Sequence, residues 1–270
     1  MAEAEVVKAK FENGFREAIL NAVNPLGGFS NFINRGEVVL LKPNFNTADP
    51  FPASTDVNFL KAVVELVYDC GAKMVIIGDS STMSLNTRKA MQKIGVFELE
   101  KMATPPRIYV FEERKWINRT IPAARYLKSV AVTEYLDRAD KLILLPCLKT
   151  HFLAQFTGSL KLSVGFTKPY QRIHLHLGHL QEKIAELNTI IHPNLVIMDA
   201  RKCFISNGPA EGKVAEPGLI MASSDRVALD VEGIKIIQSY KGNSLAGIDP
   251  WELPQIKRAV ELGIGKRVYL

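Results

Sequence analysis

The sequence predicts an α/β fold with a mostly parallel, doubly wound sheet and helices on both faces. Short, almost wholly apolar runs alternate with longer segments whose apolar residues recur every three or four positions. The chain has 270 residues, 47% of them hydrophobic, which is enough to bury a substantial core. No linker or repeat divides it. We therefore expect a single α/β domain over residues 1–270, and leave open whether two lobes form a cleft near residues 145–180.

The first half of the chain contains two predicted strand–helix units. The opening residues mix acidic with apolar side chains, which favours an amphipathic helix over an export signal. Gly71 follows a segment with one apolar helical face and is expected to end that helix. The predicted elements are a helix in residues 1–20, a strand at 37–42, a helix at 56–70, a strand at 73–79 and a helix between residues 87 and 103.

The second half repeats the alternation. Its predicted elements are strands at 141–146, 194–200 and 218–224, and helices at 179–191 and 223–237. Ser223 or Ser224 is expected to cap the last of these helices, because a serine hydroxyl accepts a hydrogen bond from the free amides of a first turn.

The composition of the chain bears on three kinds of partner, namely membranes, iron–sulfur clusters and nucleic acids, and on the location of the protein in the cell. The longest apolar runs, such as residues 141–148, fall short of the roughly 18 residues of a membrane helix, so we expect no membrane contact and a cytoplasmic protein. Cys70, Cys147 and Cys203 form no CxxC pair, and we expect no iron–sulfur cluster from this chain alone. The net charge of +6 is spread along the chain, which favours a solvated basic surface over nucleic-acid binding.

Polar residues follow several of the predicted strands. In open α/β sheets ligands bind at the carboxyl ends of the strands, so these residues are candidates for ligand binding. The alternative is that they form turns and helix caps, which is common for Asp and Ser after a strand. The candidates are Lys42, Asn44, Asp79, Ser80, Ser81 and Asp199.

The segment KTHFLAQFTGSLK, residues 149–161, holds the candidate catalytic groups Lys149, His151 and Lys161. Histidine transfers protons near neutral pH. Lys161 stands between two leucines, and an apolar environment eases loss of its proton, so it can serve as a nucleophile or an anion anchor. The alternative is a lysine whose stem is buried and whose ammonium reaches water. Thr157 and Gly158 are candidate ligand-binding residues, since glycine lets backbone amides approach an anion.

His174 and His176 are the candidate metal ligands. Two residues apart on an extended segment, their rings would point to one side and could give a metal two nitrogen ligands. The alternative is an exposed loop without metal. A divalent metal is therefore a candidate cofactor, of unspecified identity.

Seven segments resemble, in order, the domain of unknown function 362 family. They are LLKPNF, GDSS, KLILLPCLKTH, TGSLKLSVG, HPNLVIMDA, GPAEG and SSDRVALD, between residues 40 and 230. Members of that family often carry a ferredoxin-like module with cysteine-bound clusters. The resemblance therefore implies an iron–sulfur or redox protein as a candidate partner.

Residues 149–161 and the following histidines are also distantly similar to the core of lactate racemases. That resemblance implies that Lys161 tethers a nickel pincer cofactor, that His174 or His176 binds nickel, and that His151 moves a proton. The racemase loop has a second glycine and an arginine before its lysine, where this chain has Ser159 and Leu160. The racemase also uses a histidine from its first half, whereas this chain has no histidine before His151. We expect a different reaction from lactate racemisation.

Two functions of different class follow from the sequence. The first is an enzyme acting on a small anion, a carboxylate or a phosphate, by lysine and histidine acid/base chemistry of an isomerase-like or redox-like kind. The second is a noncatalytic binding or scaffold subunit that docks to an iron–sulfur or redox protein through its basic surface.

Overall fold

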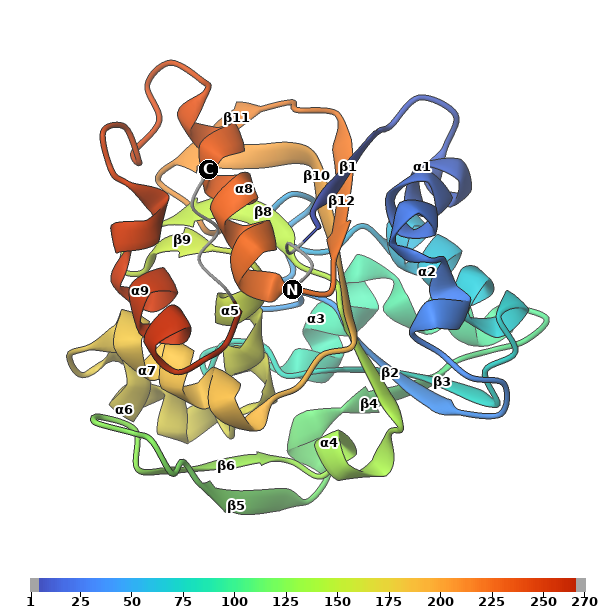
Figure 1. The fold of residues 1–270 in the computed structure, drawn as a ribbon. Coiled ribbons are helices and arrows are strands. Elements are labelled where there is room, and N and C mark those ends of the chain that lie inside the picture. The colour runs from blue at the N-terminus through green and yellow to red at the C-terminus, as the bar shows by residue number, and fades with distance from the viewer. Residues whose placement is uncertain (1–4, 266–270) are drawn as a thin grey trace.

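A ten-stranded sheet runs through the protein, with a separate two-stranded ribbon beside it (Figure 1). The structure is a computed structural model and describes residues 5–265. Along the sheet the strand order is β1 (Val7–Lys10), β12 (Leu219–Ser223), β10 (Leu195–Ser206), β7 (Lys141–Leu144), β2 (Val38–Lys42), β3 (Met74–Asp79) and β4 (Arg107–Val110). The further strands are β8 (Cys147–His151), β9 (Gln155–Thr157) and β11 (Lys213–Ala215) of this sheet, and β5 (Trp116–Thr120) with β6 (Ser129–Thr133) of the ribbon.

The sheet is mostly parallel, as predicted. The pairs from β10 through β7, β2 and β3 to β4 are all parallel, whereas β12 and β1 extend the sheet antiparallel. The α-helices are α1 (Phe15–Val23), α2 (Val57–Asp69), α3 (Thr87–Ile94), α4 (Tyr135–Arg138), α5 (Ser159–Leu162), α6 (Arg172–His176), α7 (Leu180–Leu187), α8 (Arg226–Gln238) and α9 (Pro254–Glu261). Short 3-10 helices span Asn24–Leu26, Phe29–Asn31, Val96–Lys101, Phe111–Glu113, Ser163–Phe166, Pro169–Gln171, Asn188–Ile190 and Pro250–Glu252.

Helices cover both faces of the sheet. Along β2 the buried side chains alternate between two hydrophobic clusters, because successive residues of a strand point to opposite faces. Val39 shares a cluster with Val63 of α2, and Leu40 shares the other with Ile234 of α8. This double cover confirms the predicted α/β class.

The amino-terminal prediction is wrong in part. Val7–Lys10 forms an edge strand paired with β12, and α1 begins only at Phe15. Gly14 separates the two elements with a φ of 90°, a conformation that favours glycine. The four residues of β1 show the alternating burial of an edge strand and not the one-sided burial of a helix.

The predicted cap of α8 is also wrong. The cap is Asp225, whose carboxylate accepts hydrogen bonds from the amides of Val227 and Ala228. Ser223 ends β12 instead, and its hydroxyl donates to the backbone of Glu5. Aspartate and serine are both common caps. Here Ser223 is the last residue of β12, and the side chain that caps the helix is that of Asp225.

One long strand brings together the segments that carry the candidate residues. The first part of β10 pairs with β7 and its later part with β8, so β7 and β8 follow one another along the same neighbour. The β8–β9 hairpin leads directly into α5. No helix within residues 5–265 combines the length and the apolar character needed to cross a bilayer.

Candidate functional site

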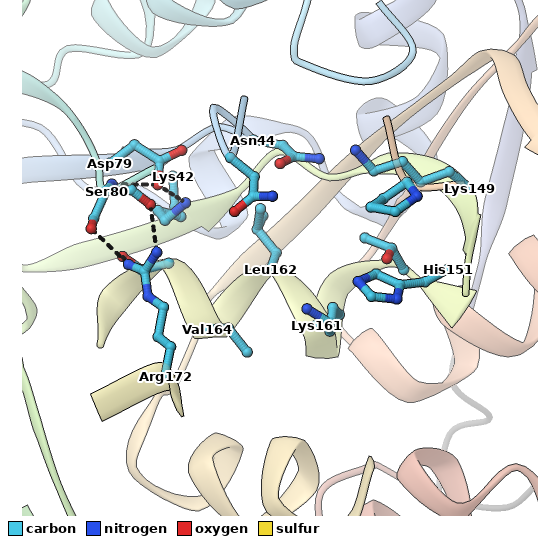
Figure 2. Close-up of a pocket in the computed structure, with 14 residues that line it drawn as sticks. Lys42, Asn44, Asp79, Ser80, Lys149, His151, Lys161, Leu162, Val164 and Arg172 are labelled. Atoms are coloured by element: carbon cyan, nitrogen blue, oxygen red, sulfur yellow. Dashed lines mark hydrogen bonds and ion pairs between the residues drawn. The ribbon is translucent and has the colours of Figure 1, made fainter. Parts of the chain in front are cut away.

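A pocket of about 50 Å³ lies beyond the carboxyl ends of β2 and β3, against the β8–β9 hairpin and α5 (Figure 2). A water molecule needs about 10–15 Å³, so this space suits a few waters or one small charged group. The lining residues are Lys42, Asn44, Asn46, Asp79, Ser80, Lys149, His151, Thr157, Lys161, Leu162, Val164, Gly165, Arg172 and Pro209. His151 and Lys161, ten residues apart in sequence, thus face one cavity, together with most of the predicted ligand-binding residues.

Lys42 and Asp79 form a buried ion pair at one side of the pocket. The Lys42 ammonium lies 2.6 Å from Asp79 Oδ1, and both side chains are almost fully buried. Burial lowers the pKa of Lys42, while the Asp79 carboxylate acts against this shift. Asp79 also accepts hydrogen bonds from the amides of Phe45 and Ser80. The two charges satisfy one another.

The absence of a side chain at Gly165 leaves space for the Lys42–Asp79 ion pair. A Cβ at position 165 would lie 2.6 Å from Lys42 Nζ and 2.9 Å from Asp79 Oδ1, closer than such contacts occur. The backbone of residue 165 therefore packs directly on the pair, and a side chain there would displace it.

Arg172 closes the same side of the pocket without a carboxylate partner. Its guanidinium donates to the hydroxyl of Ser80 (Figure 2). It also donates to the carbonyl oxygens of Ser81 and Thr167. Its Nε is buried and makes no hydrogen bond within the described chain. Burial lowers the pKa of Arg172, yet arginine stays charged. The group adds a positive charge that forms no ion pair of its own, although the carboxylates of Asp79 and Glu112 act on it from a distance.

Lys149 adds a second such charge. It leaves β8 as a buried side chain, 2% exposed, and its ammonium donates to the carbonyl oxygen of Ala53. Burial lowers its pKa to about 8. A carbonyl satisfies a hydrogen bond but does not neutralise the charge.

Lys161 is the third lysine of the pocket lining. It is partly buried on α5, and its ammonium has neither a hydrogen bond nor an ion pair with any residue of the described chain. Burial, reinforced by the positive charges of Arg172 and Lys149, lowers its pKa to about 8. An amine with that pKa exchanges its proton close to neutral pH.

His151 is held as one tautomer. Its Nδ1 accepts hydrogen bonds from the amides of Leu153, at 3.1 Å, and Ala154, at 3.2 Å. In a neutral imidazole the other nitrogen then carries the proton, so Nε2 is a donor on the ring that lines the pocket. Burial, then the charges of Lys161 and Lys149, lower the pKa of His151 to about 2. The ring is neutral at physiological pH and offers an N–H.

Two further polar groups in the lining lack partners. The Thr157 hydroxyl is buried and makes no hydrogen bond within residues 5–265. The Asn44 amide nitrogen is also buried and makes none, apart from a weak interaction with the thiol of Cys147. Buried polar atoms are usually paired, so unpaired donors around one cavity point to a ligand or ordered water.

The charge balance of the lining is strongly positive. Four residues contribute cationic groups, namely Lys42, Lys149, Lys161 and Arg172, and in the described lining Asp79 is the single carboxylate. Because Asp79 is paired with Lys42, the other three cations of the lining have no ion pair within the described chain. A small anion would relieve their mutual repulsion and supply the missing hydrogen-bond acceptors.

Other candidates from the sequence lie outside this lining. The amides that follow Gly158 bind the protein's own Asp230, whose carboxylate accepts from Ser159 and Leu160. A Cβ at Gly158 would lie 2.3 Å from Asp230 Oδ1, which explains the glycine. The backbone amides that we expected to bind a ligand anion therefore bind the carboxylate of Asp230 instead.

Ser81 and Asp199 also bind within the protein. The Ser81 hydroxyl donates to the carbonyl oxygen of Phe45. Asp199 is fully buried and forms an ion pair with Arg201, which also contacts Asp56. Ser81 lies shortly after the end of β3, but Asp199 lies within β10, which continues to Ser206, so the expectation that Asp199 ends a strand is wrong.

The geometry assumed for His174 and His176 is wrong. Both lie in the helix α6, where residues two apart differ by about 200° in direction and cannot point to one side. His176 Nδ1 lies 2.7 Å from the carbonyl oxygen of Arg172, to which it donates. Among residues 5–265 there is no group of three His, Cys, Asp or Glu side chains placed to hold a metal. The metal role of the two histidines stays a prediction without geometric support.

The sequence reasoning missed Arg172, Asn46 and Pro209. A usable signal exists for Arg172: it stands three residues before the buried Leu175, on the same face of a short helix, while His174 is exposed. Asn46 and Pro209 come from loops, where no periodicity indicates which side chain turns inward.

The family profile described as Domain of unknown function (DUF362) matches residues 39–235. The thylakoid-associated protein sll1697 of Synechocystis sp. is 28% identical over 250 residues, covering 90% of this chain and 73% of that protein.

Two solved structures are similar in fold. The lactate racemase apoprotein from Thermoanaerobacterium thermosaccharolyticum aligns over 85% of this chain with a TM-score of 0.53 and 12% identity. A Thermotoga maritima protein aligns over 83% with a TM-score of 0.53 and 10% identity. The chain spans 56% and 59% of these two proteins, and at such identities the likeness concerns the fold alone.

Proposed function

The chain belongs to the DUF362 family, and we propose that it is an enzyme that binds a small carboxylate or phosphate and moves a proton on it. The observation that supports this most directly is the Lys161 ammonium, which faces a small cavity without a partner in the described chain. An unpaired cation at such a place destabilises the folded protein, and an anionic ligand offsets that cost.

The pocket can hold an anion by several charge-assisted hydrogen bonds. Lys161 supplies the free ammonium, and His151 Nε2–H and the Thr157 hydroxyl supply neutral donors. Lys149 and Arg172 add positive potential from their fixed positions. Because these donors are positioned before the ligand arrives, they stabilise negative charge on it without reorganisation.

Lys161 is the group that moves the proton in this proposal. With a pKa of about 8, roughly a tenth of the amine is neutral at pH 7. The neutral amine can take a proton from the carbon next to a bound carboxylate: the C–H bond breaks, an N–H bond forms, and the electron pair passes to the carboxylate. Return of a proton from the lysine to the same face of that carbon restores the substrate with its hydrogen exchanged for one from solvent, and an isomerisation requires the proton to arrive at the opposite face or at another atom. His151, with its Nδ1 lone pair already used, serves as a donor.

The nickel cofactor implied by the racemase resemblance does not fit this pocket. Among residues 5–265 no three His, Cys, Asp or Glu side chains are placed to hold a metal, and the charged residues that line the pocket are mainly cationic. The loop before Lys161 also carries Ser159 and Leu160, and the Ser159 amide is bound to Asp230. The proposed proton transfer uses the side chains of the chain itself.

Binding of phosphate, acetate and lactate by calorimetry tests the proposal. Lys161→Met should weaken phosphate binding about tenfold or more, because a charge-assisted hydrogen bond contributes about 1.5–3 kcal/mol. Lys202→Met, which removes a surface lysine paired with Glu216, is the matched control and should bind normally. Incorporation of solvent deuterium into a panel of small carboxylates, followed by NMR, reads out the proton transfer.

The second function expected from the sequence, a noncatalytic subunit of an iron–sulfur or redox protein, predicts the opposite pattern. Lys161→Met would then leave function unchanged. Charge reversals on the basic surface would break the complex in a pull-down. Normal phosphate binding by Lys161→Met would therefore contradict our proposal.

A further inference from the structure

Large apolar side chains stand exposed next to the residues that line the pocket. Phe152 and Leu153, directly after His151, are 73% and 52% exposed, and Leu177 of the segment after α6 is 67% exposed. The remaining members of this set, which we call the apolar rim, are Met83, Leu85, Tyr170 and Ile173. Single exposed apolar residues are ordinary, but several around one polar cavity indicate a binding surface.

The rim segments meet at the pocket although they are far apart in sequence. The guanidinium of Arg172, between Tyr170 and Ile173, donates to the carbonyl oxygen of Ser81, shortly before Met83. Gln181 donates to Gln155 at 3.0 Å, which links the start of α7 to the β8–β9 hairpin. His176 is also close enough to His151 to lower its pKa. The loop after β3, the hairpin and the α6 region therefore surround one opening.

The size of the cavity limits what can enter it. About 50 Å³ accommodates a carboxylate or phosphate group, whose charge matches the cationic lining. The remaining atoms of any larger ligand must lie outside the cavity, where they would contact the apolar rim. Because water is released when apolar surfaces meet, an apolar body would gain affinity at this rim.

We propose that the ligand of this pocket is amphiphilic: a small carboxylate or phosphate head fills the cavity while an apolar body lies on the apolar rim. This inference rests on the proposed function, since it assigns the substrate class of the same site. It excludes lactate-sized ligands as the best substrates. The ligand is a soluble small molecule, and a membrane surface is the alternative that the vesicle experiment below tests.

Calorimetry with inorganic phosphate and hexyl phosphate tests the inference. Hexyl phosphate should bind at least tenfold more tightly, since each buried methylene favours binding. Leu153→Ser and Leu177→Ser should each remove several-fold of that gain and leave phosphate affinity unchanged. Val214→Ser, an exposed apolar residue of β11 outside the rim, is the matched control and should keep the full gain.

The outcomes separate this inference from the proposed function. Equal affinity for the two probes, or a gain that survives both rim substitutions, overturns the amphiphile while the anion site stands. Failure of both phosphate probes to bind, together with failure of acetate and lactate to bind, overturns the anion site itself. Binding to phosphatidylcholine vesicles containing phosphatidic acid, without binding of hexyl phosphate, overturns the small-molecule ligand in favour of a membrane surface.

Discussion

Lys42 Nζ and Asp79 Oδ1 lie 2.6 Å apart in a part of the molecule that water hardly reaches. The two residues end neighbouring parallel strands, so the ion pair joins β2 to β3 at the edge of the sheet where the pocket opens. Removal of one member leaves the other as an isolated buried charge, which is far more costly than removal of both.

Asp79→Asn should therefore destabilise the protein by about 3–5 kcal/mol, measured by urea unfolding. The double variant Lys42→Met with Asp79→Asn should recover a large part of that loss, because no unpaired ammonium remains. A double variant as unstable as Asp79→Asn would show that the pair is not the source of the effect.

Lys161→Met should stabilise the protein while it weakens anion binding. The ammonium lacks a partner in the described chain, so its replacement by an apolar side chain of similar length removes a desolvation cost of about 1–3 kcal/mol. The melting temperature should rise by about 2–8 °C at pH 7 without ligand. An unchanged or lower melting temperature would mean that the charge is already compensated.

The same substitution should change the pH dependence of stability. The folded protein releases the Lys161 proton near pH 8, whereas the unfolded chain holds it to about 10.5. Between these values the unfolded state binds more protons, so this group makes stability rise with pH. The advantage of Lys161→Met over wild type should therefore shrink from pH 8 to pH 10. Melting curves across that window check the sign, and an advantage that grows contradicts it.

Anion binding should take up protons near pH 8. A bound anion favours the charged forms of Lys149 and Lys161 and raises their pKa values from about 8. Sulfate, which does not titrate in this range, is the appropriate probe. Titrations at pH 8 in buffers of different ionisation enthalpy give the number of protons, which should approach zero at pH 6 and fall in Lys161→Met. Uptake that is equal at both pH values would argue against the lysines.

His151 should show no titration between pH 5 and pH 8. Its pKa of about 2 and its bonded Nδ1 predict a neutral ring protonated on Nε2 throughout this range. Nitrogen-detected NMR distinguishes the tautomers, and His151→Gln assigns the signal. A ring signal that shifts near pH 6 would restore His151 as a conventional acid/base.

The strands and the polar residues at their ends could be predicted from the sequence because both depend on local patterns. Lys42, Asn44 and Asp79 follow apolar runs that can only be buried strands, and parallel strands end at a common edge. Lys161 and His151 were found for a related reason, since both lie on the segment that follows such a run.

The rest of the site depends on tertiary contacts that no local pattern encodes. Arg172 is held at the pocket by carbonyl groups of two residues that lie 92 and 91 positions earlier in the chain. The carboxylate of Asp230 accepts from the amides of Ser159 and Leu160, 71 and 70 positions earlier in the chain. The alternate spacing of His174 and His176 predicts that both rings point to one side of an extended segment, whereas the five residues after a proline-containing turn form the helix α6.

The close packing of Gly165 on the Lys42–Asp79 pair has an evolutionary consequence. A side chain at position 165 would force the ammonium or the carboxylate to move, so we expect glycine at the equivalent position of homologues that keep both charges in this arrangement. A relative with alanine or a larger residue there must have rebuilt this corner of its binding site, and its chemistry should be inferred afresh.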